Sequence, residues 1–289
     1  MKTRNKNDFL TFMLPSLVAV LMVLAVPLCY DIIVSFFDKS LKYQGLGNFI
    51  GLNNYIAALK NDEFTGSVVT TWIFTLGVVS VEFVLGLLIA LGLNSLKKGK
   101  NLIFTIIIIP MMITPIAVGL IWRLILHPQL GILNYLLSFF GVDKVAWLGD
   151  SKIALLSVMF VDIWQNIPYM VLVLMAGLVT LPIEPFESAL IDGASRRQSF
   201  FHLTVPMMMP TFSVVILLRA IMSFKTYDLI YVMTRGGPGT VTQLISYTIY
   251  NQAYRYLKTG SAASMSIYLV LMIVPIAILF LWLSRSRED

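Results

Sequence analysis

A long apolar stretch in the middle of the chain, residues 153–180, carries a row of polar side chains. Four of them stand at positions i, i+3, i+4 and i+7 of a helix: Asp162, Gln165, Asn166 and Tyr169. This spacing places them on one helical face. Lipid would penalise such a face, so it must contact protein or water. Carboxylate and amide groups can hydrogen-bond the polar groups of a ligand, and a tyrosine adds an aromatic ring. The pattern therefore predicts a polar binding site.

A second apolar stretch, residues 206–233, carries Arg219 and, one turn later, Ser223. Asp162 lies nine residues beyond Ile153, and Arg219 lies nine residues beyond Pro210. Each is therefore about 14 Å along its helix, near the middle of a bilayer about 30 Å thick. Ionisable residues at this depth indicate a site or an internal pair. Two interpretations remain open and are compatible: all six polar residues line a site, or an Asp162–Arg219 salt bridge only joins two helices.

The elements that must position these residues are membrane-spanning helices. The chain has 289 residues, 58% of them hydrophobic and 12% charged, whereas soluble domains carry about a quarter charged residues. A spanning helix needs about 20 apolar residues. We predict an all-α membrane protein with one domain, 1–289, and six spans: 10–36, 67–93, 102–125, 153–180, 206–233 and 262–284. Glu82, inside the second span, is expected to hydrogen-bond a neighbouring helix rather than to act in coupling.

Positive charge predicts the orientation of the spans. The short loop Ser95–Asn101 has three lysines and no acidic residue, which is typical of a cytoplasmic loop. Further basic residues of the predicted inner segments lie at the two ends of the chain: Lys2, Arg4, Lys6, Arg285 and Arg287. We therefore predict that both termini are inside, and we interpret the first apolar run as an uncleaved span. The net charge of +6 is explained by orientation rather than by nucleic-acid binding.

The inner loop 181–206 differs from the other loops. Pro185 can begin a short helix with an apolar face, and Gly193 permits a backbone break. Ser195 and Gln198 form a capping-box pattern for a second short helix, which Pro206 is expected to interrupt near the membrane. Two angled helices of this kind could be a docking element or an ordinary surface cover of the bundle, and the residues alone favour neither.

This loop resembles the EAA loop of bacterial ABC importer permeases. The family pattern Glu-Ala-Ala-x3-Gly-x9-Ile-x-Leu-Pro is matched at every spacing from Glu187 to Pro206, with Ser188, Leu203 and Val205 as mild departures. Further similar segments extend the resemblance over nearly the whole chain and narrow it to the maltose-type carbohydrate branch: 49–55, 191–194, 234–239 and 260–263.

The resemblance implies a type I permease architecture and a division of labour. Such a permease pairs with a second permease, an ABC ATPase dimer and an extracytoplasmic solute-binding protein in the bacterial inner membrane. The implied ATPase-coupling residues are Phe186, Glu187, Ala189, Asp192, Gly193 and Ala194. The chain contains no G-x-x-x-x-G-K-[ST] phosphate loop. We therefore expect no catalysis and no metal or cofactor in this chain, with ATP and Mg on the partner ATPase.

In related maltose-type permeases the sugar contacts come from similar stretches of the core helices. The expected substrate is thus a sugar or oligosaccharide, and Arg219 makes an anionic or derivatised sugar a further candidate. The alternative is an ion-coupled secondary transporter of a polar solute. Uptake that stops when ion gradients collapse, while ATP is plentiful, would favour that alternative.

Overall fold

The computed structural model describes residues 6–96 and 98–285. The orientation prediction rests partly on Lys2, Arg4, Lys97 and Arg287, which lie outside this part of the chain. The described residues are helical apart from loops and an isolated antiparallel bridge between Phe37 and Phe49. They fall into two compact units, one comprising the chain up to Thr65 with Ile249–Val270, the other comprising Gly66–Thr248 and the chain from Leu271.

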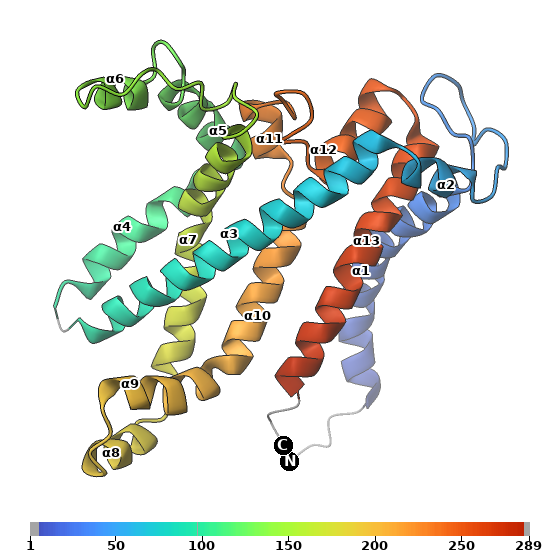
Figure 1. Cartoon of the computed structure of the whole chain (residues 1–289). Coiled ribbons are helices and arrows are strands. Elements are labelled where there is room, and N and C mark those ends of the chain that lie inside the picture. Colours follow the sequence, from blue (N-terminus) through green and yellow to red (C-terminus); the bar gives the residue numbers. More distant parts are fainter. Residues whose placement is uncertain (1–5, 97, 286–289) are drawn as a thin grey trace. The chain divides into compact units, whose positions relative to one another are not determined.

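The helices follow one another along the chain as Figure 1 labels them. The first are α1 (Lys6–Ser35), α2 (Asn53–Leu59), α3 (Asp62–Ser95), α4 (Lys100–Met112), α5 (Pro115–Ile125), α6 (Ile132–Ser138) and α7 (Ala154–Val179). The others are α8 (Glu184–Ile191), α9 (Arg196–Ser199), the π-helical turn η1 (Phe200–Thr204), α10 (Val205–Phe224), α11 (Asp228–Met233), α12 (Ile245–Tyr250), the π-helical turn η2 (Asn251–Arg255) and α13 (Thr259–Arg285).

Five helices of the described chain are long and apolar enough to cross a membrane: Met13–Ser35, Asp62–Ser95, Ala154–Val179, Arg196–Phe224 and Thr259–Phe280. A sixth crossing results if the pair α4 and α5 is counted as one span, although the two helices meet at 93°. The predicted all-α membrane fold is confirmed. Its third span, 102–125, is sharply bent rather than straight.

The first unit is held together near its loops by backbone and side-chain hydrogen bonds. The Asn54 Nδ2 group donates to the Ser35 and Phe37 carbonyl oxygens at 2.8 and 2.9 Å. The Ser40 hydroxyl donates to the Leu257 carbonyl oxygen at 2.8 Å. These bonds join the end of α1 to segments distant in sequence, so the loops that follow α1 are firmly ordered.

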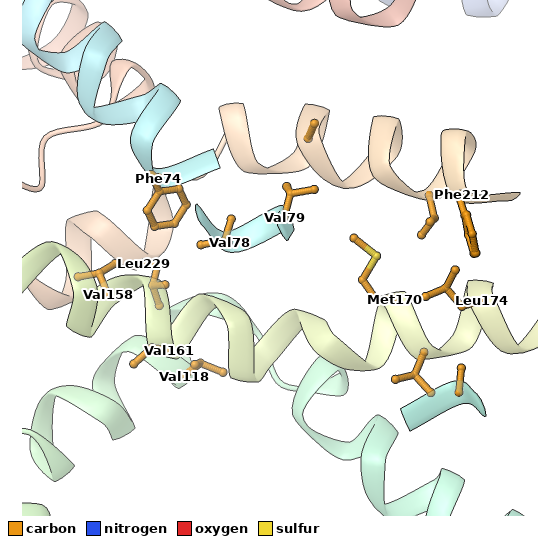
Figure 2. Close-up of a cluster of buried hydrophobic side chains, with 14 of the residues drawn as sticks. Phe74, Val78, Val79, Val118, Val158, Val161, Met170, Leu174, Phe212 and Leu229 are labelled. Carbon is orange, nitrogen blue, oxygen red and sulfur yellow. The ribbon is translucent and has the colours of Figure 1, made fainter. Parts of the chain in front are cut away.

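The core of the second unit gathers around α7, the most deeply buried of the spanning helices. Figure 2 shows its apolar side chains packed with those of four neighbours. They are Phe74, Val78 and Val79 of α3, Val118 of α5, Val158, Val161, Met170 and Leu174 of α7, Phe212 of α10 and Leu229 of α11. In this unit, α8 and α9 lie at one end of α7 and α5, α6 and α11 lie at the other (Figure 1).

Two glycines of α3 face α7 but differ in what surrounds them. A Cβ atom at Gly86 would lie 2.7 Å from the Cβ of Met170, which is fixed to the backbone. A Cβ at Gly77 would meet only the terminal methyl of Met159, at 2.1 Å. Because a flexible side-chain end can move aside, only the first position requires the two helix backbones to separate.

We therefore expect Gly86→Ala to lower the free energy of unfolding by about 1–3 kcal/mol through overpacking. Gly77→Ala is the matched control, since both changes give the same gain in helix propensity. The thermal unfolding midpoints of the two purified variants in detergent check this. Equal midpoints would contradict the close approach of α3 and α7 at Gly86.

Candidate functional site

Three buried charged residues connect α3, α7 and α10. Arg219 donates from Nε to Glu82 Oε2 at 2.6 Å and from Nη2 to Glu82 Oε1 at 2.8 Å. Nη2 also donates to Asp162 Oδ2. Glu82, Arg219 and Asp162 are 0%, 1% and 4% exposed. Each buried carboxylate therefore contacts a positive charge, although one arginine serves both of them.

The Asp162–Arg219 pair predicted as one of two interpretations is thus present, and the interhelical bond expected of Glu82 is made to the same arginine. The sequence did not indicate that the three residues form one group. Depth counted along straight, parallel helices placed Glu82 nearer the inner side. In the structure α3 has 34 residues, about 51 Å at 1.5 Å per residue, and it crosses α7 obliquely (Figure 1). An oblique helix reaches a given depth after more residues.

A polar pocket of about 190 Å³ lies against this charged group. Its walls come from the start of α5, the middle of α7, the end of α10, the segment after α10 and the start of α11. The lining residues are Pro115, Asp162, Gln165, Asn166, Arg219, Met222, Lys225, Thr226, Tyr227, Asp228 and Leu229. Four of the six residues predicted for the site therefore share one cavity: Asp162, Gln165, Asn166 and Arg219.

The other two predicted residues lie outside the pocket walls. Ser223 is fully buried, and its hydroxyl is 3.0 Å from the hydroxyl of Thr75 on α3, where it joins two helices. Tyr169 is half-buried, one turn further along α7 from Gln165 and Asn166, and packs against the apolar core. The pocket is shorter along the helices than the polar row of the sequence indicated.

Two interrupted helices border the pocket. The α4–α5 bend leaves Ile113 outside both helices, and the Gln165 Nε2 group donates to its carbonyl oxygen at 3.1 Å. The second interruption lies at Lys225–Tyr227, between α10 and α11, where the Ser246 hydroxyl donates to the Thr226 carbonyl oxygen. The predicted span 206–233 is therefore wrong at its end, because α10 stops at Phe224. Non-helical backbone at membrane depth is tolerated where protein or a polar cavity surrounds it.

The second interruption supplies an aromatic side chain that the sequence did not single out. Tyr227 lines the pocket and is stacked between two other tyrosines. Its ring centroid is 5.5 Å from that of Tyr231 and 6.1 Å from that of Tyr247, with interplanar angles of 26° and 25°. The sequence prediction placed residues 225–227 inside a continuous span and therefore did not single out Tyr227. In the structure these residues form a break between α10 and α11, and Tyr227 lines the cavity there. Lys225 and Asp228, on either side of it, were the available signal of an interruption.

The loop 181–206 contains the two short helices that the sequence predicts. α8 has Pro185 in its first turn, and Gly193 follows in the left-handed region at φ 76°. Ser195 and Gln198 form the complete capping box of α9. The expected interruption at Pro206 is wrong: η1 leads directly into α10, and the helix is continuous over Arg196–Phe224. The π-helical turn η1 lies directly before Pro206, and this local irregularity accommodates the proline within the continuous helix.

The predicted coupling residues occupy two environments in this loop. Glu187, Asp192 and Gly193 are exposed, whereas Phe186, Ala189 and Ala194 are half-buried. Ala189 and Ala194 line a hollow of about 290 Å³ with Gln198, Ser199, His202 and Leu203. The apolar surface that α8 and its flanks expose consists instead of Ile183, Leu190 and Ile191, at 63%, 75% and 86% exposure.

The described part of the chain contains no group of three or more His, Cys, Asp or Glu side chains that could hold a metal ion. An all-helical membrane protein with a polar pocket between interrupted helices has the construction of a solute transporter. The comparisons with known proteins define the class further. The chain matches the family described as binding-protein-dependent transport system inner membrane component over residues 82–288.

Full-length relatives and a solved structure agree with this match. The chain is 36% identical to the probable ABC transporter permease protein y4oQ of Sinorhizobium fredii, over 94% of this chain and 88% of the relative. It is 34% identical to the trehalose/maltose transport system permease protein MalF of Thermococcus litoralis, over 96% of this chain and 93% of the relative. A chain of a bacterial ABC transporter involved in the import of the acidic polysaccharide alginate has the same fold, with a TM-score of 0.86, 22% identity and 98% of each chain covered.

The chain therefore belongs to the family of binding-protein-dependent transport system inner membrane components. It is a permease subunit, the non-catalytic membrane component of an ABC transporter, as the EAA-like loop predicts. The ion-coupled secondary transporter considered from the sequence is a different class and is set aside.

Proposed function

We propose that this permease moves a sugar or oligosaccharide into a bacterial cell across the cytoplasmic membrane, with both of its termini inside. An extracytoplasmic binding protein delivers the sugar, and a separate ATPase dimer with its own ATP and Mg drives the cycle. The named relative that transports trehalose and maltose and the binding-protein dependence in the family description support this proposal.

We propose that the sugar crosses through the pocket beside Arg219. Its polar groups can donate to and accept from hydroxyls: the amides of Gln165 and Asn166, the Asp162 carboxylate and the Thr226 hydroxyl. Tyr227 adds an aromatic side chain to the pocket wall, with its ring stacked on two neighbouring tyrosines. The volume of about 190 Å³ is below the roughly 300–1,000 Å³ of most ligand sites. We therefore propose that a second, similar permease completes the site.

The exposed α8–α9 segment is the proposed contact with the ATPase. Its apolar side chains Leu190 and Ile191 are unusually exposed, and an exposed apolar patch on a folded element commonly marks an interaction surface. Glu187 and Asp192 add charges beside it. This end of the unit lies opposite the end that holds α5 and α11 (Figure 1), so an ATPase bound there would not cover these two helices, which contribute to the pocket wall.

Asn166→Ala tests the crossing site. Asn166 lines the pocket, and its Nδ2 group donates within its own helix, to the Asp162 carbonyl oxygen at 2.9 Å. Removing the amide should therefore reduce sugar uptake about ten-fold or more, as expected when about 1.4 kcal/mol or more of binding is lost, while the complex still assembles. Uptake into proteoliposomes and co-purification of the subunits measure the two effects.

Leu156→Ala is the matched control, because Leu156 lies on the same helix and is 61% exposed. It should transport normally. Unchanged substrate dependence in Asn166→Ala would remove this pocket from the pathway, whereas loss of assembly would indicate a structural role for the amide.

A further inference from the structure

The ion pairs of Arg219 determine which ligand charge the pocket accepts. Building on the proposed function, we infer that the pocket takes an uncharged sugar and discriminates against anionic ones such as uronates and sugar phosphates. The sequence left the opposite reading open, since a buried arginine is a common partner of carboxylates and phosphates.

Two of the three guanidinium nitrogens of Arg219, Nε and Nη2, are already bonded to carboxylates within the protein. A guanidinium binds a carboxylate or phosphate most strongly through two parallel N–H groups. In this chain Nε and Nη2 form that bidentate pair with the two oxygens of Glu82, and Nη2 also binds Asp162. The side chain of Arg219 is only 2% exposed. An incoming anion could therefore bind through two parallel N–H groups only by displacing a buried carboxylate, because both such pairs include Nη2.

The charged residues around the cavity also carry no net positive charge. Among the lining residues the cations Arg219 and Lys225 are balanced by the acids Asp162 and Asp228. Glu82 lies directly behind Arg219 and adds a third acid, so the formal charge of this group of five is minus one. Protonation of one buried carboxyl group would bring the sum to zero, and no single protonation makes it positive. An anion entering the pocket would lose its water without a compensating charge.

An uncharged sugar meets no such penalty. Its hydroxyls can exchange hydrogen bonds with the amides and the carboxylate. The negative bias of the wall favours hydroxyl groups as donors to Asp162 and Asp228. The arginine is thus a positioning residue that holds Asp162 at the wall, rather than a receptor for a ligand charge.

The test measures ligand retention by the purified transporter in lipid nanodiscs. The binding protein is left out, so that its own sugar preference does not affect the result. The probes are a mixed panel of neutral disaccharides, their uronate counterparts and disaccharide phosphates, and the retained sugars are identified by mass spectrometry. We expect the wild-type protein to retain neutral members at least ten-fold over anionic members. Glu82→Gln removes one negative charge without altering the pocket surface, and should reduce this ratio about ten-fold.

Asp228→Asn is a second variant outside the buried ion pairs, and it should shift the ratio in the same direction even if Glu82→Gln does not fold. Asp143→Asn, at an exposed loop residue outside the pocket, is the matched control and should leave the ratio unchanged.

Preferential or equal retention of anionic sugars by the wild-type protein would overturn the inference and leave the sugar site standing. The inference would also be overturned if neither Glu82→Gln nor Asp228→Asn changes the ratio. Retention of no sugar of either kind would overturn the proposed site itself.

Discussion

Replacing Arg219 by leucine is expected to be the most damaging single change in the membrane core. It would leave Glu82 and Asp162 buried on neighbouring helices, at 0% and 4% exposure, without a counter-charge. Breaking a buried ion pair by removing one partner costs about 3–5 kcal/mol, and here one residue serves two carboxylates. We expect little folded protein in the membrane and a strongly lowered thermal midpoint of what remains, measured by fluorescence-detected size exclusion of detergent extracts.

A charge-free triple variant separates the unpaired charges from the loss of packing. Glu82→Gln, Asp162→Asn and Arg219→Gln together leave three polar but neutral side chains at the same positions. Replacing a buried ionic group as a whole is often nearly neutral for stability, so the triple variant should regain most of the folded protein and still fail to transport. If Arg219→Leu alone accumulates and unfolds like the wild type, the three residues do not hold the helices together.

Gly193→Val is expected to abolish transport while the chain still inserts and folds. Gly193 separates α8 from α9 at φ 76°, a conformation that a β-branched residue rarely adopts. A Cβ at this position would have no atom within 4 Å, so the change acts only through the backbone and alters the angle between the two short helices. We expect sugar-stimulated ATP hydrolysis of the assembled transporter to fall about ten-fold or more, with membrane insertion unchanged.

Gly193→Asn is the matched control for backbone conformation. Asparagine tolerates the left-handed region far better than valine, and the space around the residue is open to a side chain. This variant should retain most of the activity. Equal activity of the valine and asparagine variants would show that the bend between α8 and α9 has no role in coupling.

The sequence predicted the helices of this fold better than the places where they bend or end. Hydrophobic length predicted each long apolar helix of the described residues, because a bilayer requires about 20 apolar residues whatever the neighbours are. The capping box at Ser195 and the glycine at Gly193 likewise act within a few residues and were predicted correctly. The bend at Ile113 was not, because prolines are tolerated within membrane helices and Pro115 gives no sign that the chain turns by 93° there.

The site was predicted only in part, because local patterns located some of its residues and the bends and tilts of the helices located the others. The α7 residues of the pocket share one helical face, so local periodicity was enough to find them. Tyr227 and Glu82 required tertiary information: one depends on where α10 ends, the other on the oblique course of α3. Residue types in a sequence show which charges are buried, whereas the identity of their partners depends on helix tilt.

The helix Arg196–Phe224 has one further consequence for how the molecule moves. It is one continuous helix of 29 residues, bent where η1 joins α10 (Figure 1), that begins close to Gly193 and ends at the pocket wall. Arg219 lies on this helix and is bonded to α3 and α7. A displacement of the Arg196 end therefore reaches the cavity through hydrogen-bonded helix without a loop between them, and the contacts of the guanidinium lie directly in its path.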